Sequence, residues 1–133
     1  MSKNLKIVQD YFNAVAIGDF ETVGNLFADD AVWHQPGKGV QSGTYNGKME
    51  LFGHLGNFGK WSDGTFAMDE IKFISENQDL VAVSIHFKAE KDGKSLSMNG
   101  IDLLRIVDDK IKEVWLFSER IDEEDEFWNF ASK

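Results

Sequence analysis

The first sixty residues carry the apolar spacing of amphipathic helices. Ser2 can cap a first helix, whose apolar side chains recur three and four residues apart at Leu5, Val8, Phe12 and Val15. Gly18 suits the end of that helix because glycine tolerates the left-handed conformation, and Asp19 can cap a short second helix that runs to Phe27. A third helix is predicted over Lys48–Trp61, with four apolar side chains facing inward: Met49, Phe52, Leu55 and Phe58.

Between the second and third helices the pattern is that of turns around a short strand. The stretch Asp29–Gly37 predicts a turn, a short strand and a second turn, because Pro36 cannot donate to a strand ladder. We expect an irregular loop from Gly39 to Gly47.

Beyond Gly64 the pattern changes to that of β-strands. Short polar turns separate four long runs, which favours antiparallel pairing of neighbours: Phe66–Glu76, Leu80–Glu90, Lys94–Val107 and Lys110–Ser118. A last short helix holds Phe127, Trp128 and Phe130. No linker or repeat interrupts the chain, so we predict a single α+β domain over residues 1–133. In it a curved antiparallel sheet wraps around three N-terminal helices as a cone-shaped barrel, with a cavity at its wide end.

Composition and charge exclude several functional classes. The formal net charge is −9 and no basic run occurs, so we expect no binding to nucleic acid or to an anionic membrane surface. The absence of cysteine excludes disulfides and thiolate chemistry. Neither a signal peptide nor a stretch of roughly 20 apolar residues is found, which predicts a cytoplasmic protein. The 11 Phe and 4 Trp side chains favour either a thick core or an aromatic-walled cavity.

The sequence offers no signature of a bound metal or cofactor. The three histidines do not have the HExxH spacing, and no Walker A or GxGxxG pattern occurs. We therefore expect no metal and no cofactor.

Asp102 is an acid on an apolar strand face. Because side chains alternate between the faces of a strand, one face of the third long run carries Met98, Gly100, Asp102, Leu104 and Ile106. A buried carboxyl either finds a hydrogen-bond donor or stays protonated. Asp102 is thus either a structural acid bonded to Tyr, Trp or backbone, or a functional acid in a pocket, where acids with perturbed pKa values gather.

Several other side chains are candidates for the pocket. A histidine can act as base or acid near neutral pH, which makes His34 a candidate for proton transfer. Adjacent strand residues face opposite ways, so His34 and Gln35 are not both expected to line the pocket. Candidate ligand contacts, each equally consistent with plain core packing, are Trp33, Phe52, Trp61, Met98 and Trp115.

Three glycines recur at every third position of the third helix, at Gly53, Gly56 and Gly59. Glycine in a helix interior costs about 1 kcal/mol relative to alanine, so some gain should offset it. Close packing on the sheet and a flexible pocket rim are the two explanations, and we favour packing.

Motifs spread over nearly the whole chain resemble the SnoaL-like branch of the nuclear transport factor 2-like superfamily. They are Tyr11–Ala14, Gly18–Asp19, Leu26–Gly37, Gly43–Gly47, Ile111–Glu119 and Asp125–Trp128. The resemblance implies a conical fold with a deep pocket and a homodimer formed through the outer sheet face. It does not imply one function, because relatives include isomerases, cyclases, hydrolases, dehydratases and non-enzymatic modules.

The resemblance also implies roles for single residues. Compared with ketosteroid isomerases of the same superfamily, Tyr11 and Asp102 fall at the two oxyanion-hole positions, the second of which is a protonated aspartate. Gln35 falls where those enzymes carry the aspartate base, and glutamine cannot abstract a proton. Glu119 falls near an acid that moves protons in SnoaL-like cyclases, although an exposed ion pair with Arg120 is the simpler interpretation.

Three functional hypotheses follow. The first is an isomerase, cyclase, hydrolase or dehydratase acting on a small apolar, oxygen-bearing ligand, with Tyr11 and Asp102 binding an oxygen and His34 or Glu119 moving a proton. The second is a non-catalytic ligand-binding or accessory dimeric module, which Gln35 favours. The third is an assembly module, because the outer face of the sheet is too apolar for water.

Overall fold

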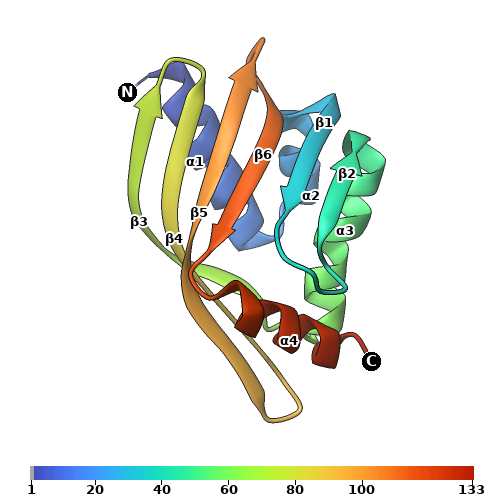
Figure 1. Cartoon of the computed structure of the whole chain (residues 1–133). Helices are drawn as coiled ribbons and strands as arrows, with labels where there is room; N and C mark the ends of the chain where they lie inside the picture. Colours follow the sequence, from blue (N-terminus) through green and yellow to red (C-terminus); the bar gives the residue numbers. More distant parts are fainter. Residues whose placement is uncertain (1) are drawn as a thin grey trace.

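The computed structural model describes residues 2–133, in which helices cover one side of a bent sheet (Figure 1). The helices are α1 (Lys3–Ile17), α2 (Phe20–Leu26), α3 (Gly47–Trp61) and α4 (Ile121–Ala131). The strands are β1 (Phe27–Gln35), β2 (Gly43–Asn46), β3 (Ala67–Asn77), β4 (Leu80–Lys91), β5 (Lys94–Val107) and β6 (Lys110–Ser118). The first three helices lie behind the sheet in Figure 1, and α4 lies across the end where β6 leaves it.

The six strands form one sheet in the order β2-β1-β6-β5-β4-β3. Strands β3 to β6 pair antiparallel as the predicted meander. Strand β1 pairs parallel with β6, so the prediction of a wholly antiparallel sheet is wrong at this one pairing. The sheet curves around the helices without closing, since β2 and β3 remain its two edges. The α+β architecture expected from the sequence is confirmed.

The predicted capping residues begin both of the first two helices and end the first. Ser2 Oγ accepts the Leu5 amide hydrogen at 3.1 Å, and Asp19 Oδ1 accepts that of Thr22 at 3.2 Å. Gly18 closes α1 with φ 72°, in the left-handed region that glycine tolerates.

Two expectations in the segment before the long strands are wrong. Gly43–Asn46 is not loop but β2, which pairs antiparallel with the end of β1. In α3, Met49 is 90% exposed, whereas the buried side chains are those of Leu51, His54 and Phe58. At about 100° per residue, Met49 lies some 200° around the helix from Leu51 and therefore faces solvent.

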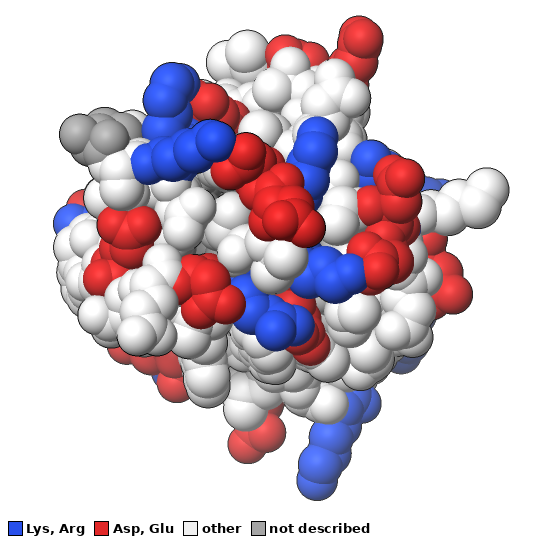
Figure 2. Space-filling view, turned by 90° about the horizontal axis from the view of Figure 1, so that it is seen from above, with Lys and Arg blue, Asp and Glu red and all other residues white. Residues whose placement is uncertain are grey.

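The two faces of the sheet differ sharply. The inner face is buried and apolar, with Val81, Val83, Ile85 and Phe87 on β4 facing the helices. The residues that alternate with the buried ones lie on the outer face, for example His86 of β4 and Arg105 of β5. Charges of both signs are interspersed on the molecular face seen in Figure 2. Within residues 2–133, every helix is too short or too polar to cross a membrane.

Candidate functional site

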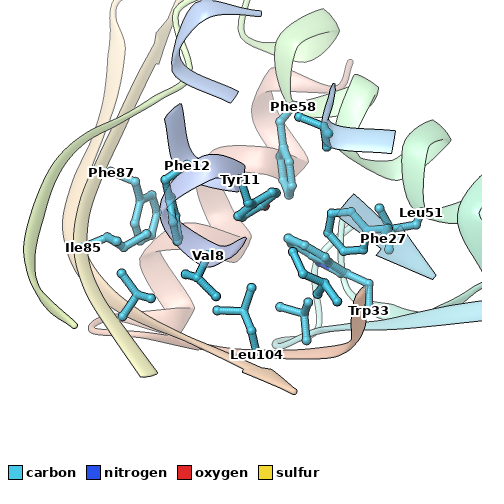
Figure 3. Packing of buried hydrophobic residues seen from close by; sticks show 14 of the residues in the cluster. Val8, Tyr11, Phe12, Phe27, Trp33, Leu51, Phe58, Ile85, Phe87 and Leu104 are labelled. Atoms are coloured by element: carbon cyan, nitrogen blue, oxygen red, sulfur yellow. The ribbon is translucent and has the colours of Figure 1, made fainter. Parts of the chain in front are cut away.

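A cavity of about 400 Å³ lies between the inner face of the sheet and the helices. Figure 3 shows Tyr11, Trp33 and Phe58 reaching this interior from α1, β1 and α3, with Ile85 and Phe87 on the sheet side. The other apolar side-chain residues that line it are Val15, Phe20, Val23, Leu55, Phe66, Met68, Leu116 and Phe117. The polar side chains that line it are few: Tyr11, Trp33, Gln35, Asp102, Ser118 and Glu124. An apolar hollow of this size with a few polar groups is typical of a small-molecule site.

Asp102 lines the cavity from the middle of β5. Its side chain is buried, and within residues 2–133 its carboxyl forms no hydrogen bond. Burial raises the pKa of Asp102 to about 7, and negative charge on Glu124 adds to the rise. Asp102 thus lines the cavity, and within residues 2–133 its carboxyl is not tied to Tyr, Trp or backbone.

Glu124 brings a second carboxyl to the same cavity from the first turn of α4. It is 3% exposed, and it accepts hydrogen bonds from Ser118 Oγ at 2.5 Å and from Trp128 Nε1 at 3.2 Å. Burial raises the pKa of Glu124, while these two hydrogen bonds act in the opposite direction by favouring the charged form.

Tyr11 supplies a hydroxyl from α1 that remains free to donate. Burial raises the pKa of Tyr11 far above its ordinary value, and negative charge on Asp102 raises it further. The phenol is therefore protonated throughout the physiological pH range. No residue from 2 to 133 takes up its hydroxyl in a hydrogen bond, so the group is available to a ligand.

Gln35 is oriented by two neighbours. Its Oε1 accepts from Trp33 Nε1 at 2.9 Å and lies 2.9 Å from His54 Nε2. Burial lowers the pKa of His54 to about 4, so this imidazole is neutral and donates through Nε2. Because Oε1 already has two hydrogen-bond partners, the amide NH2 of Gln35 is the group that remains available to a ligand in the cavity.

Four residues that line the cavity are also exposed: Phe20, Gly56, Gly59 and Phe117. From the first three, which come from α2 and α3, we infer a mouth between these two helices. A Cβ added at Gly53, Gly56 or Gly59 would meet nothing within 4 Å. The interpretation of these glycines as close packing against the sheet is therefore wrong, and two of them border the mouth.

Comparison with known proteins identifies the family. The family model described as SnoaL-like domain matches residues 8–114. The chain belongs to the SnoaL-like domain family. The resemblance drawn from the sequence motifs is thereby confirmed.

Solved structures show the same fold over most of the chain. A protein of unknown function with cystatin-like fold from Xanthomonas campestris is 38% identical, with a TM-score of 0.90 over 94% of this chain and 97% of that one. IdmH, a putative polyketide cyclase from Streptomyces antibioticus, has a TM-score of 0.73 at 21% identity over 89% and 93% of the two chains, which shows the fold alone.

Sequence comparison adds a relative of similar length. An uncharacterized protein of Mycobacterium tuberculosis (strain ATCC 25618 / H37Rv) is 25% identical over 125 residues, which make up 94% of this chain and 95% of the relative.

The structure brings four of the predicted residues of this SnoaL-like chain together, namely Tyr11, Trp33, Gln35 and Asp102. His34 lies on the outer sheet face instead, where its Nε2 is 2.6 Å from Glu113 Oε2. Trp115 stacks on His34 there, with ring centroids 5.5 Å apart, so it is not a wall of the cavity.

The other four predicted residues also lie outside the lining. Glu119 is exposed, accepts the Asn99 amide hydrogen at 2.9 Å and pairs with Arg120 at 3.2 Å, as the simpler interpretation expected. Phe52, Trp61 and Met98 pack in or against the core beside the cavity.

Sequence reasoning missed Glu124, which stands in the acidic run Asp122–Glu126 just before Phe127, where acidic residues commonly begin a helix. The signal lay in the helical spacing, because Glu124, Phe127, Trp128 and Ala131 recur at three, four and seven residues and all four are buried. Among the described residues, no three His, Asp or Glu side chains gather as a metal site requires.

Proposed function

We propose that this SnoaL-like domain is an enzyme that acts on a small, largely apolar, oxygen-bearing molecule by acid/base chemistry, without a cofactor. The observation that carries the proposal is a buried carboxyl, Asp102, which faces an apolar cavity without a partner among residues 2–133. A carboxyl so placed is a hydrogen-bond donor near neutral pH, and such acids gather at functional sites.

Three side chains are suited to hold the ligand oxygen. The Tyr11 hydroxyl, the protonated Asp102 carboxyl and the Gln35 amide NH2 are all donors that line one cavity. Donors aimed at an oxygen that gains negative charge stabilise the transition state more than the ground state. The proposed oxygen site therefore favours reactions that pass through an enolate or alkoxide.

The rest of the cavity selects for an uncharged, apolar ligand. Within the described residues, its lining holds no Lys, Arg or His that would neutralise a carboxylate or phosphate. Aromatic walls such as Phe58, Phe66 and Phe87 suit rings and alkyl chains. The likeness to a putative polyketide cyclase makes cyclisation one candidate, beside isomerisation, hydrolysis and dehydration.

The first experiment is a ligand screen by melting temperature. Hydrophobic ketones, phenols and steroids are tested on the wild type and on Asp102→Asn, and compounds that bind are assayed for conversion. We expect one class to raise the wild-type melting temperature, with a smaller or altered effect in the variant. If no compound stabilises the wild type, the proposal is wrong.

A non-catalytic binding module is the second candidate. Gln35, at the position of the isomerase base, is the observation that favours it. Binding that persists in Asp102→Asn with no conversion of any bound compound would select this alternative.

A further inference from the structure

Two carboxyl groups from distant parts of the chain share one apolar cavity. Asp102 comes from the inner face of β5 and Glu124 from α4, and they lie near enough that charge on Glu124 disfavours ionisation of Asp102. The lining, as far as residues 2–133 define it, supplies no cation to stabilise two negative charges. Two neighbouring carboxyl groups in such a setting do not both ionise readily, so near neutral pH the pair holds one proton.

The hydrogen bonds around the pair decide where that proton resides. Glu124 accepts from Ser118 and Trp128, and both bonds favour its charged form. Asp102 has no such donor among the described residues, so its neutral form is favoured. The resting pair is therefore a neutral Asp102 beside a charged Glu124.

From this arrangement we infer that Glu124 is the proton acceptor and Asp102 the proton donor in tautomerisation of an uncharged, apolar ketone bound between them. The inference rests on the proposed function and deepens it, because it names a base and a substrate class.

The proton transfers balance without a co-reactant. Glu124 removes a proton from the carbon next to the carbonyl, and the electrons of that C–H bond form the carbon–carbon double bond. The carbonyl oxygen takes the proton of Asp102 and is hydrogen-bonded by Tyr11. The products are an enol, a neutral Glu124 and a charged Asp102, and return of a proton to carbon restores the ketone.

The cavity favours this route because its net charge does not change. The pair carries one negative charge before and after the transfer, so no new charge is created in a low-dielectric site. The only other titratable side chain in the described lining, Tyr11, is protonated and is therefore a donor. Glu124 is thus the one lining group, within residues 2–133, with the character of a base.

The test measures deuterium uptake by NMR. Each ketone that raises the wild-type melting temperature is incubated in D2O with the wild type, Glu124→Gln, Glu124→Asp and Glu126→Gln. Glutamine can keep both hydrogen bonds of Glu124, since its oxygen accepts from Trp128 and its NH2 donates to Ser118. Glu126 is exposed on the same helix, which makes the identical substitution there a matched control.

We expect uptake at the carbon next to the carbonyl to fall at least about 100-fold in Glu124→Gln. It should stay within about twofold of the wild type in Glu126→Gln and be partly retained in Glu124→Asp, which keeps a carboxyl. Equal uptake in Glu124→Gln and the wild type, or a bound ketone with no uptake above buffer, overturns the inference while the proposed function stands. If no ketone binds the wild type but a phenol does, the inference is wrong while the proposed function stands; if no compound of the screen binds, both are wrong.

The pH profile separates a catalytic base from a structural acid. Uptake should rise with pH as Glu124 ionises and fall again as Asp102 loses its proton, because both must be in the right state. The groups that face the pair are Tyr11 from α1, Ser118 from β6 and Trp128 from α4, while Asp125 acts on Glu124 through its charge. Asp102→Asn should remove the alkaline limb, and a profile that keeps this limb contradicts the assignment.

Discussion

Asp102 shows how an ordinary residue gains unusual chemistry from its surroundings. Alternation along β5 was enough to place it on the inner face, because its neighbours Gly100 and Leu104 are also buried there. That part of the site was predictable from sequence alone. The second carboxyl was not, since the preference of acids for helix starts gives the same pattern as a buried Glu124.

The raised pKa of Asp102 makes stability depend on pH in the direction opposite to that of most acids. The unfolded carboxyl has a pKa near 4, whereas the folded one has a pKa of about 7, so the folded state binds the proton more tightly. Its contribution to the free energy of unfolding is therefore greatest below pH 4 and is lost as pH rises to about 7. Between these two pKa values the free energy of unfolding falls by roughly 1.4 kcal/mol for each pH unit, and above pH 7 the loss is complete.

Asp102→Asn should remove this dependence. We expect the variant to gain stability relative to the wild type between pH 4 and pH 8, by up to about 4 kcal/mol. Urea unfolding at pH 4, 6 and 8 measures it. Asp108→Asn, at the exposed turn after β5, is the control and should follow the wild-type curve. A constant difference between Asp102→Asn and the wild type at all three pH values would contradict the buried-acid account.

At the scale of elements, the glycines of α3 and the glycine of β5 have opposite surroundings, open space in the first case and close contacts in the second. Gly56 and Gly59 face open space at the cavity mouth. In β5, a Cβ at Gly100 would lie 2.8 Å from the Phe117 carbonyl oxygen and 3.1 Å from Phe87 Cε1. The helix glycines border the cavity without packing against a neighbouring element, whereas the strand glycine allows close packing beside Asp102.

Alanine and phenylalanine substitutions distinguish these reasons. Gly56→Ala and Gly59→Ala should each raise the free energy of unfolding by about 1 kcal/mol, and Gly100→Ala should lower it by roughly 1–3 kcal/mol. Gly56→Phe should block ligand-induced stabilisation, whereas Gly53→Phe, on the same helix away from the lining, should not. Thermal unfolding with and without a bound ketone checks both, and equal ligand effects in the two Phe variants would contradict the proposed mouth.

The type of each element was predictable where the residue pattern was unambiguous. Where the pattern was ambiguous, the prediction failed. Caps at Ser2 and Asp19 and the polar turns between the long strands are local signals, and the structure follows them. In β6 the run Val114–Phe117 is apolar at every position, so alternation could not tell that Trp115 faces outward. The parallel pairing of β1 with β6 joins segments about 80 residues apart, which no local pattern encodes.

For the whole molecule, the outer sheet face carries an apolar row without cover in the single chain. Phe73, Ile101 and Phe117 lie in register across β3, β5 and β6, with Ser84 of β4 between the first two. They are 59%, 41% and 59% exposed. On that face Arg105 and Glu113 already pair with each other at 2.6 Å, so the apolar row is the part of the surface that a second copy would cover.

The homodimer expected from the sequence therefore remains our prediction. Sedimentation equilibrium should give twice the 15.1 kDa of one chain, and Ile101→Lys, in the middle of the row, should give the mass of a monomer. Asp108→Asn is again a suitable control, because it changes an exposed turn. A wild-type protein that sediments as a monomer at all concentrations would contradict the prediction.

The most direct test of the central claim is a carbon-13 NMR titration of the carboxyl groups, with Asp102→Asn and Glu124→Gln used to assign the two signals. We expect the Asp102 carboxyl to lose its proton near pH 7, at a higher pH than Glu124. Substitution of Glu124 by Gln should lower the Asp102 midpoint, because it removes a neighbouring negative charge. Titration of both groups below pH 5, with no effect of either substitution on the other, would contradict the shared-proton pair on which the proposed chemistry depends.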